Sequence, residues 1–131
     1  MDRRVPLALL LAVNACHIGA SAGSVAAERG PFGAAAELNL GATELKGELV
    51  AVRDSGLIML PAGGRITFVP FSRIAEGRFA HVPASLHGRQ PPTPKERDAL
   101  RVASRFPQGL SPDLEQRLLA AYGQATLSPA P

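Results

Sequence analysis

Residues 45–70 read LKGELVAVRDSGLIMLPAGGRITFVP, and the alternation within this stretch decides the predicted fold. Within residues 45–51 the side chains alternate with a period of two, which is typical of a strand. Residues 57–60 form a short apolar run, as in a well-buried strand, and residues 66–70 alternate again. The stretch therefore predicts three consecutive strands.

Turn signals separate these strands. The sequence Asp-Ser-Gly at residues 54–56 favours a turn in which Gly56 adopts a positive φ, and Pro-Ala-Gly-Gly at residues 61–64 favours another. Gly47, inside the first strand, predicts a bend or bulge. Strands joined by tight turns in this order predict an antiparallel meander.

The pattern continues towards the C-terminus. Residues 71–74 have the pattern of a single helical turn, and residues 77–82 that of a fourth strand. We therefore expect residues 37–82 to form a small antiparallel β-barrel or curled sheet of about four to five strands. The prolines and glycine of residues 83–93 exclude regular structure, so we interpret this segment as a linker.

Two helices are predicted after the linker, and each has a start signal. Thr93 begins a capping box, with proline at the first helical position and Glu96 three residues on, and Ser111 repeats the signal. The short connection between them predicts a helical hairpin over residues 94–123, so the fold class is α+β. Residues 124–131 are predicted to be a disordered tail. The expected apolar faces consist of Ala99, Val102, Ala103 and Phe106 in the first helix and Leu114, Leu118, Ala121 and Tyr122 in the second.

The N-terminus has the organisation of an export signal. Two arginines precede an apolar run over residues 7–13, which is about half of what a membrane-spanning helix needs. Val-Asn-Ala-Cys at residues 13–16 resembles the lipobox of bacterial lipoproteins, with Asn in place of the usual small or hydroxyl residue. The resemblance implies removal of residues 1–15 as a signal peptide and attachment of a diacylglycerol to the thiol of Cys16.

Two other interpretations of the N-terminus stay open. One is soluble secretion, with cleavage after Ala22 or Ala27, and the other is a misassigned start codon on a cytosolic protein. Cys16 is the only cysteine, so no intramolecular disulfide can form, and acylation gives this residue a chemical role. Residues 16–36, rich in Ala, Gly and Ser, are predicted to be a flexible tether.

Composition limits the class of partner. The formal net charge is +3, and it falls to +2 without residues 1–15, which is a mild excess for a nucleic-acid-binding domain. The absence of Trp and a single Tyr leave little surface for stacking on bases. Arg97, Arg101 and Arg105 recur at steps of four and form a basic stripe. This stripe is the candidate binding edge for anionic headgroups or an anionic polymer.

A further resemblance concerns the β region. The sequence Gly-Glu-Leu at residues 47–49, Asp54 and the helical turn before the last strand make residues 43–82 resemble an Sm-like or SH3-like small barrel. The resemblance implies a shared scaffold, and a scaffold does not determine function. Ser and Gly follow Asp54, whereas Sm-like proteins bind RNA there with a stacking side chain and an Asn.

Catalytic and metal-binding patterns are absent from the sequence. His17 lies beside the proposed anchor at Cys16, and His81 and His87 have no cysteine or carboxylate at ligand spacing, whereas a zinc site needs three or four such groups. The one G-x-S-x-G match, at residues 19–23, lies in the Ala-, Gly- and Ser-rich predicted tether and not between a predicted strand and helix, and the chain contains no phosphate-binding loop. We therefore predict no catalytic residue, no metal and no cofactor.

These observations support one main hypothesis and two alternatives. The main hypothesis is an exported, membrane-anchored lipoprotein domain facing the periplasm or cell exterior. It would bind a protein partner or an anionic envelope component without catalysis. The first alternative is a cytosolic, Sm-like oligomeric nucleic-acid-binding protein, and the second is an enzyme whose site is assembled from distant residues. Exposed apolar side chains on the helices would favour partner binding.

Overall fold

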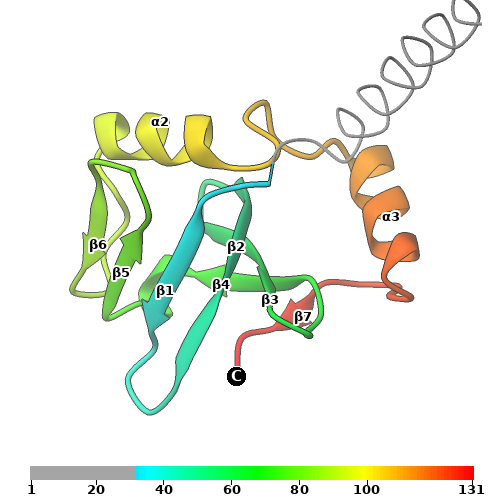
Figure 1. Cartoon of the computed structure of the whole chain (residues 1–131), viewed down its shortest axis with the longest axis horizontal. Coiled ribbons are helices and arrows are strands. Elements are labelled where there is room, and N and C mark those ends of the chain that lie inside the picture. The colour runs from blue at the N-terminus through cyan, green and yellow to red at the C-terminus, as the bar shows by residue number, and fades with distance from the viewer. Residues whose placement is uncertain (1–31) are drawn as a thin grey trace, which may run out of the picture. The chain divides into compact units, whose positions relative to one another are not determined.

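The computed structural model of the chain describes residues 32–131 (Figure 1). Its elements in chain order are β1 (Ala35–Asn39), β2 (Glu44–Val52), β3 (Gly56–Pro61), β4 (Thr67–Pro70), η1 (Phe71–Arg73), β5 (Glu76–Phe79), β6 (Ser85–His87), α2 (Pro94–Ala103), α3 (Pro112–Ala121) and β7 (Ser128–Pro129). The predicted signal peptide, Cys16 and residues 16–31 of the predicted tether lie outside the described residues.

The predicted meander is confirmed as β2, β3 and β4, which pair antiparallel in chain order. The apolar run at residues 57–59 is fully buried in β3. Gly56 does not take the positive φ that the turn signal allows; it begins β3, where a Cβ would lie only 2.4 Å from Val69 O. In the next turn Gly63 does adopt a positive φ, of 67°.

A β-bulge in β2 gives the sheet two apolar faces. Pairing with β3 shifts between Leu49 and Ala51, so Val50 and Ala51 share one face while Leu49 lies on the other. The irregularity predicted at Gly47 therefore occurs further along the strand. Gly47 instead allows β3 to approach closely, because a Cβ there would lie 2.3 Å from Leu60 O.

The strands form a 7-stranded sheet in the order β6-β5-β1-β2-β3-β4-β7. Neighbouring strands are antiparallel except β4 and β7, which are parallel, so the sheet is mixed. The edge of β4 is covered by β7 rather than by β5, and the described sheet is therefore not a closed barrel. The α+β class is confirmed, with more strands than the sequence predicted.

Three strands correct the predicted segment boundaries. The tether prediction is wrong from Ala35, where β1 begins and pairs with both β2 and β5. The linker prediction for residues 83–93 is wrong at β6, which turns Leu86 into the core. The prediction of a disordered tail at residues 124–131 is wrong because β7 extends the sheet there.

Gln124 explains why the C-terminal segment is ordered. Its side chain is buried, its Oε1 accepts from Ile66 N at 2.7 Å, and its Nε2 donates to Ile66 O at 3.0 Å and Thr126 O at 3.1 Å. The amide of Ser128 then donates to Ile66 O at 2.9 Å. One amide side chain thus satisfies both backbone groups of the residue that precedes β4.

The two helices begin where the sequence predicts. Thr93 and Glu96 form the complete capping box of α2, and the Ser111 side chain accepts from Leu114 N at the start of α3. Pro94 and Pro112 occupy the first helical positions. Both start signals are therefore confirmed.

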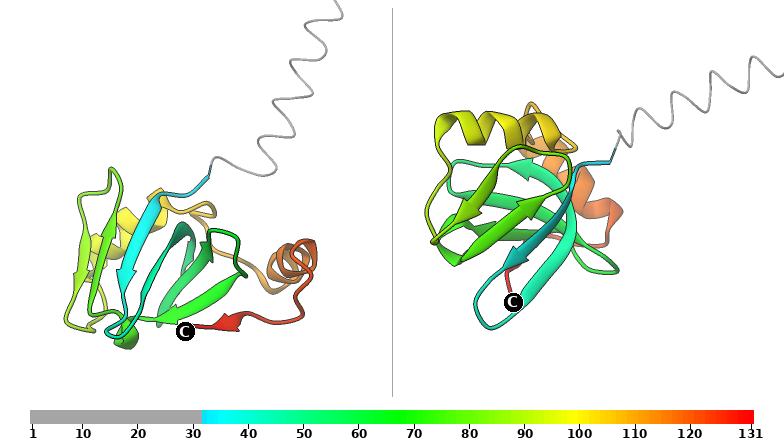
Figure 2. Two further views of the ribbon diagram at one scale, coloured as in Figure 1. Left: turned by 60° about the horizontal axis from the view of Figure 1, so that its bottom comes forward. Right: turned by 60° about the vertical axis from the view of Figure 1, so that its left-hand side comes forward.

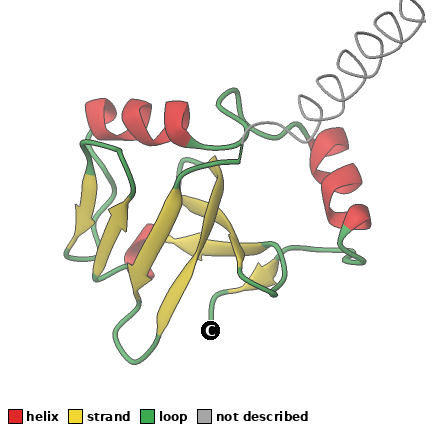
Figure 3. Ribbon diagram, viewed as in Figure 1, coloured by secondary structure: helices red, strands yellow, loops and turns green. Residues whose placement is uncertain are grey.

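The predicted hairpin is wrong, because the helices cover different faces of the sheet. Leu100 of α2 packs in a core with Leu49 and Met59, whereas Leu119 of α3 packs in a second core with Val50. The bulge in β2 creates two apolar faces, and each face is covered by one helix. Figures 2 and 3 show the helices apart, joined by the loop of residues 104–111.

The predicted helix faces also need correction. In α2 the fully buried side chain is Leu100, while Val102 is 76% exposed. In α3 the fully buried side chain is Leu119, and Ala121 and Tyr122 are exposed. Helical spacing predicted the helices, but their orientation is set by the faces that the sheet leaves uncovered.

Candidate functional site

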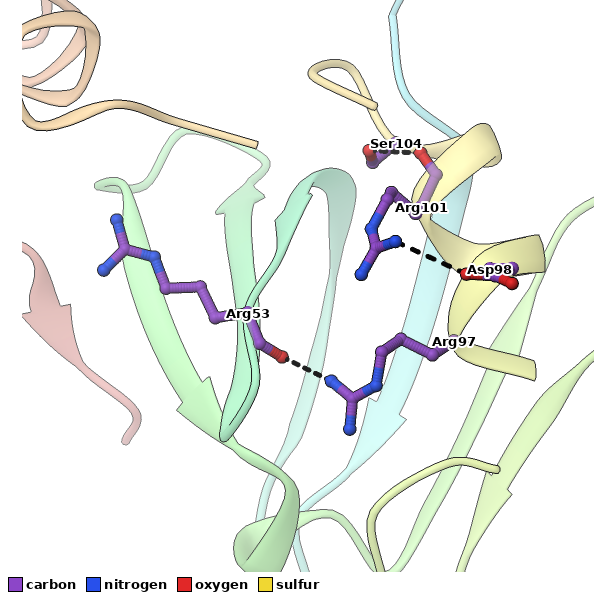
Figure 4. Close-up of polar contacts among 5 residues, drawn as sticks. All are labelled: Arg53, Arg97, Asp98, Arg101 and Ser104. Carbon is purple, nitrogen blue, oxygen red and sulfur yellow. Dashed lines mark hydrogen bonds and ion pairs between the residues drawn. The ribbon is translucent and has the colours of Figure 1, made fainter. Parts of the chain in front are cut away.

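The three arginines of the predicted stripe have separate surroundings, and Figure 4 shows those of Arg97 and Arg101. Arg97 lies in α2 and donates from Nη1 to the carbonyl oxygen of Arg53 at 2.9 Å. Its guanidinium also lies 5.5 Å from the centre of the Phe71 ring. Arg97 therefore fixes the end of β2 to the helix, and its charge is directed into the fold.

Arg101 lies about one turn further along α2 than Arg97. Its Nη1 lies 3.3 Å from Asp98 Oδ1, and its side chain is 42% exposed. Its carbonyl oxygen accepts a hydrogen bond from Ser104 Oγ at 2.7 Å, which closes the end of α2 (Figure 4). Arg101 therefore has a partly exposed side chain beside the exposed carboxylate of Asp98.

Arg105 forms a buried, two-pronged ion pair with Glu48. Its Nε and Nη2 donate to Glu48 Oε2 and Oε1 at 2.7 and 2.6 Å. The two side chains are only 8% and 14% exposed. The hydrogen bond to Glu48 raises the pKa of Arg105 above its ordinary value, against the lowering effect of burial. Tyr122 adds to the increase, so its hydroxyl lies close to the guanidinium.

This ion pair holds the segment with which the described domain begins. Glu48 Oε2 accepts from the Gly33 amide at 2.7 Å, and the Phe32 ring lies 5.3 Å from the Arg105 guanidinium carbon. The amide of Ala34 donates to Ala103 O at 2.8 Å. We name Phe32, Gly33, Glu48 and Arg105 the junction, because they join the N-terminal segment to β2 and the end of α2.

Glu48 is a site residue that sequence reasoning did not identify. It lies 57 residues from Arg105, and no local pattern links the two positions. The available signal is that Glu48 directly precedes the apolar run of residues 49–52 in β2. The stripe prediction included Arg105 but assigned it to an exposed surface. The junction shows instead that two of the three arginines are used within the fold, so the stripe is not one continuous binding edge.

Two grooves are lined by residues outside the junction. One, of about 400 Å³, is lined by Arg53, Ser55, Phe68, Leu127, Ser128 and Pro129 beside β4 and β7. The other, of about 500 Å³, is mostly apolar and is lined by His81, Val82, Pro83, Asp98, Ala99, Val102 and Ala103 beside α2. Both have apolar floors with a few polar groups, which is the character of a binding groove.

The two described histidines do not contribute to a common metal site. His81 is exposed and has a positive φ of 61°, and His87 is exposed with Nε2 2.8 Å from Ser85 Oγ. His17 lies outside the described residues. Within residues 32–131, no group of three or more His, Cys, Asp or Glu side chains is arranged to hold a metal ion.

The described chain also contains no helix long and apolar enough to cross a membrane. Comparison with known proteins adds no relative, because no family model, no curated protein and no solved structure matches the chain.

Proposed function

We propose that this chain is an exported lipoprotein domain that is held at a membrane by a diacylglycerol on Cys16. The observation that carries the proposal is the position of the only cysteine, directly after a short apolar run that two arginines precede. A lipid on that residue would anchor the domain without a membrane-spanning helix.

The domain would act by binding a protein partner rather than by catalysis. The groove beside β4 and β7 supports this role, because Phe68 and Leu127 form an apolar floor next to the polar groups of Arg53 and Ser55. Such a groove suits an apolar side chain from an extended protein segment. The internal use of Arg97 and Arg105 favours a protein over an anionic polymer, because these cations are not free to contact phosphates or carboxylates.

The anchor can be tested by metabolic labelling with an alkyne-bearing fatty acid in a bacterial host. We expect the wild-type chain to incorporate the label and to sediment with membranes, whereas Cys16→Ser should be unlabelled. Ser72→Ala, an exposed change in η1, is the matched control and should behave as wild type. Label on both proteins would contradict the proposal, as would a wild-type chain that is unlabelled and stays in the cytosol. An unlabelled wild-type chain that is exported would instead support soluble secretion.

A further inference from the structure

Large apolar side chains are exposed at three positions of the described chain. Phe32 is 74% exposed, Val102 is 76% exposed and Tyr122 is 40% exposed. Burial of such side chains is favourable, so a group of them on one surface marks a contact with an apolar partner. We name these three residues the apolar rim.

The rim surrounds the junction. The Phe32 ring lies 5.3 Å from the Arg105 guanidinium carbon, and Tyr122 lies close to the same guanidinium. Val102 is next to Ala103, whose carbonyl oxygen accepts from Ala34 N. It also lines the mostly apolar groove beside α2. The rim and this groove therefore lie at the end of the domain where the N-terminal segment joins it.

We propose that the apolar rim contacts the lipid bilayer. This inference rests on the proposed anchor, because the segment that carries Cys16 ends at Phe32, which belongs to the rim. Phe32 follows Cys16 by sixteen positions, and a chain of that length spans at most about 55 Å. A lipid on Cys16 would therefore hold Phe32 within about that distance of the membrane, and contact between the rim and the bilayer would then fix which end of the domain faces the membrane.

The chemistry of the rim fits a membrane surface. Phe and Tyr rings suit the boundary between headgroups and acyl chains, where the apolar ring is buried and the Tyr hydroxyl stays hydrated. Arg101, one residue before Val102, has a partly exposed guanidinium that can meet lipid phosphates. The junction fixes Phe32 to the domain, so contact with the bilayer would set the orientation of the whole domain.

In this orientation the two ends of the domain would lie at different distances from the bilayer. The turn between β1 and β2, which contains Ala42, lies at the end of the sheet away from α2 in Figure 1 and in the right-hand view of Figure 2. It would therefore face away from the bilayer. The groove beside β4 and β7 is distinct from the rim and would stay available to a partner.

The test uses full-length protein in vesicles of phosphatidylethanolamine and phosphatidylglycerol that contain doxyl-labelled lipid. Because acylation consumes the Cys16 thiol, Val102→Cys supplies a single site for a fluorophore, and Ala42→Cys supplies the matched control. We expect the doxyl lipid to quench the fluorophore at position 102 at least about twofold more than the fluorophore at position 42.

The outcomes separate this inference from the proposed function. A lipidated, membrane-bound protein with equal quenching at both positions would overturn the membrane contact and leave the anchor in place. Stronger quenching at position 42 would reverse the proposed orientation. A protein that carries no lipid on Cys16 would overturn the proposed function and the membrane contact together. Adding Phe32→Ser to Val102→Cys should reduce quenching at position 102 if the rim itself makes the contact.

Discussion

Glu48 and Arg105 form the most buried ion pair among the described residues. Both oxygens of the carboxylate are occupied, and one of them also accepts from the Gly33 amide. Burying two charges is costly, and the cost is offset only when their hydrogen bonds are complete. The removal of one partner therefore leaves a buried charge without compensation.

Arg105→Leu should lower the free energy of unfolding by about 3–5 kcal/mol, because it leaves Glu48 buried and unpaired. Arg78→Leu is the matched control, since Arg78 and Glu37 form an exposed pair that contributes at most about 1 kcal/mol. Urea denaturation of both variants measures the difference.

The raised pKa keeps Arg105 charged, and the contribution of its charge to stability is lost only as the pH rises through the folded-state value. The loss in Arg105→Leu should thus be equal at neutral and mildly alkaline pH. Similar losses in the two variants would contradict the structural role of the buried pair.

Gly33 is a further residue of the junction that other residues cannot replace, because there is no room for a Cβ at this position. A Cβ at this position would lie 1.9 Å from Leu49 O and 2.8 Å from Arg105 N, and both neighbours are backbone atoms. Gly33→Ala should therefore displace the N-terminal segment and speed hydrogen exchange at the Leu49 amide, which donates to Ala34 O at 2.9 Å. Gly64→Ala, where the nearest atom is a Pro61 side-chain carbon at 3.1 Å, should leave that exchange rate unchanged. Unchanged exchange in Gly33→Ala would mean that the segment is not held as described.

At the scale of elements, the stability of the helices depends on the hydrogen bonds that cap their first turns. Thr93→Ala removes the side chain that accepts from Glu96 N, so the free energy of unfolding should fall by about 1 kcal/mol. Ser72→Ala, in the exposed part of η1, should change it by less than about 0.5 kcal/mol. Thermal unfolding followed by circular dichroism measures both variants. A Thr93→Ala protein as stable as wild type would show that tertiary contacts alone hold the start of α2.

The C-terminal strand depends on Gln124. Gln124→Ala leaves the Ile66 amide without its partner and removes one of the two donors to Ile66 O, so the free energy of unfolding should fall by about 1–3 kcal/mol. Gln116→Ala, on the exposed side of α3, should be close to neutral. Denaturant titration distinguishes the two variants. Equal stability of the two variants would show that β7 is attached in another way.

Local signals in the sequence account for the meander, the turn at Gly63 and both helix starts. Those features depend on residues a few positions apart, as in the capping box of Thr93 and Glu96. The elements that the sequence does not predict depend on distant partners. β6 needs the edge of β5, β7 needs Gln124 against Ile66, and the junction needs Glu48 opposite Arg105. No local period encodes such pairs, so the separate positions of the helices and the junction became visible only in the folded chain.

At the scale of the whole molecule, the fold and the proposed anchor support one arrangement. The N-terminal segment meets the domain at the junction, the apolar rim lies around that point, and the groove beside β4 and β7 lies elsewhere on the domain. A domain tethered in this way can contact the bilayer at one end while it binds a partner at another. This arrangement requires that the mature chain begins at Cys16.

The mass of the intact mature protein, purified from membranes, tests that requirement most directly. We predict a chain of residues 16–131 that carries a diacylglycerol on Cys16, and alkaline hydrolysis should remove the mass of the ester-linked acyl chains and leave glycerol bound to Cys16 through its thioether. A mature chain that begins after Ala22 or Ala27, or one that retains the N-terminal fifteen residues without lipid, would contradict the account.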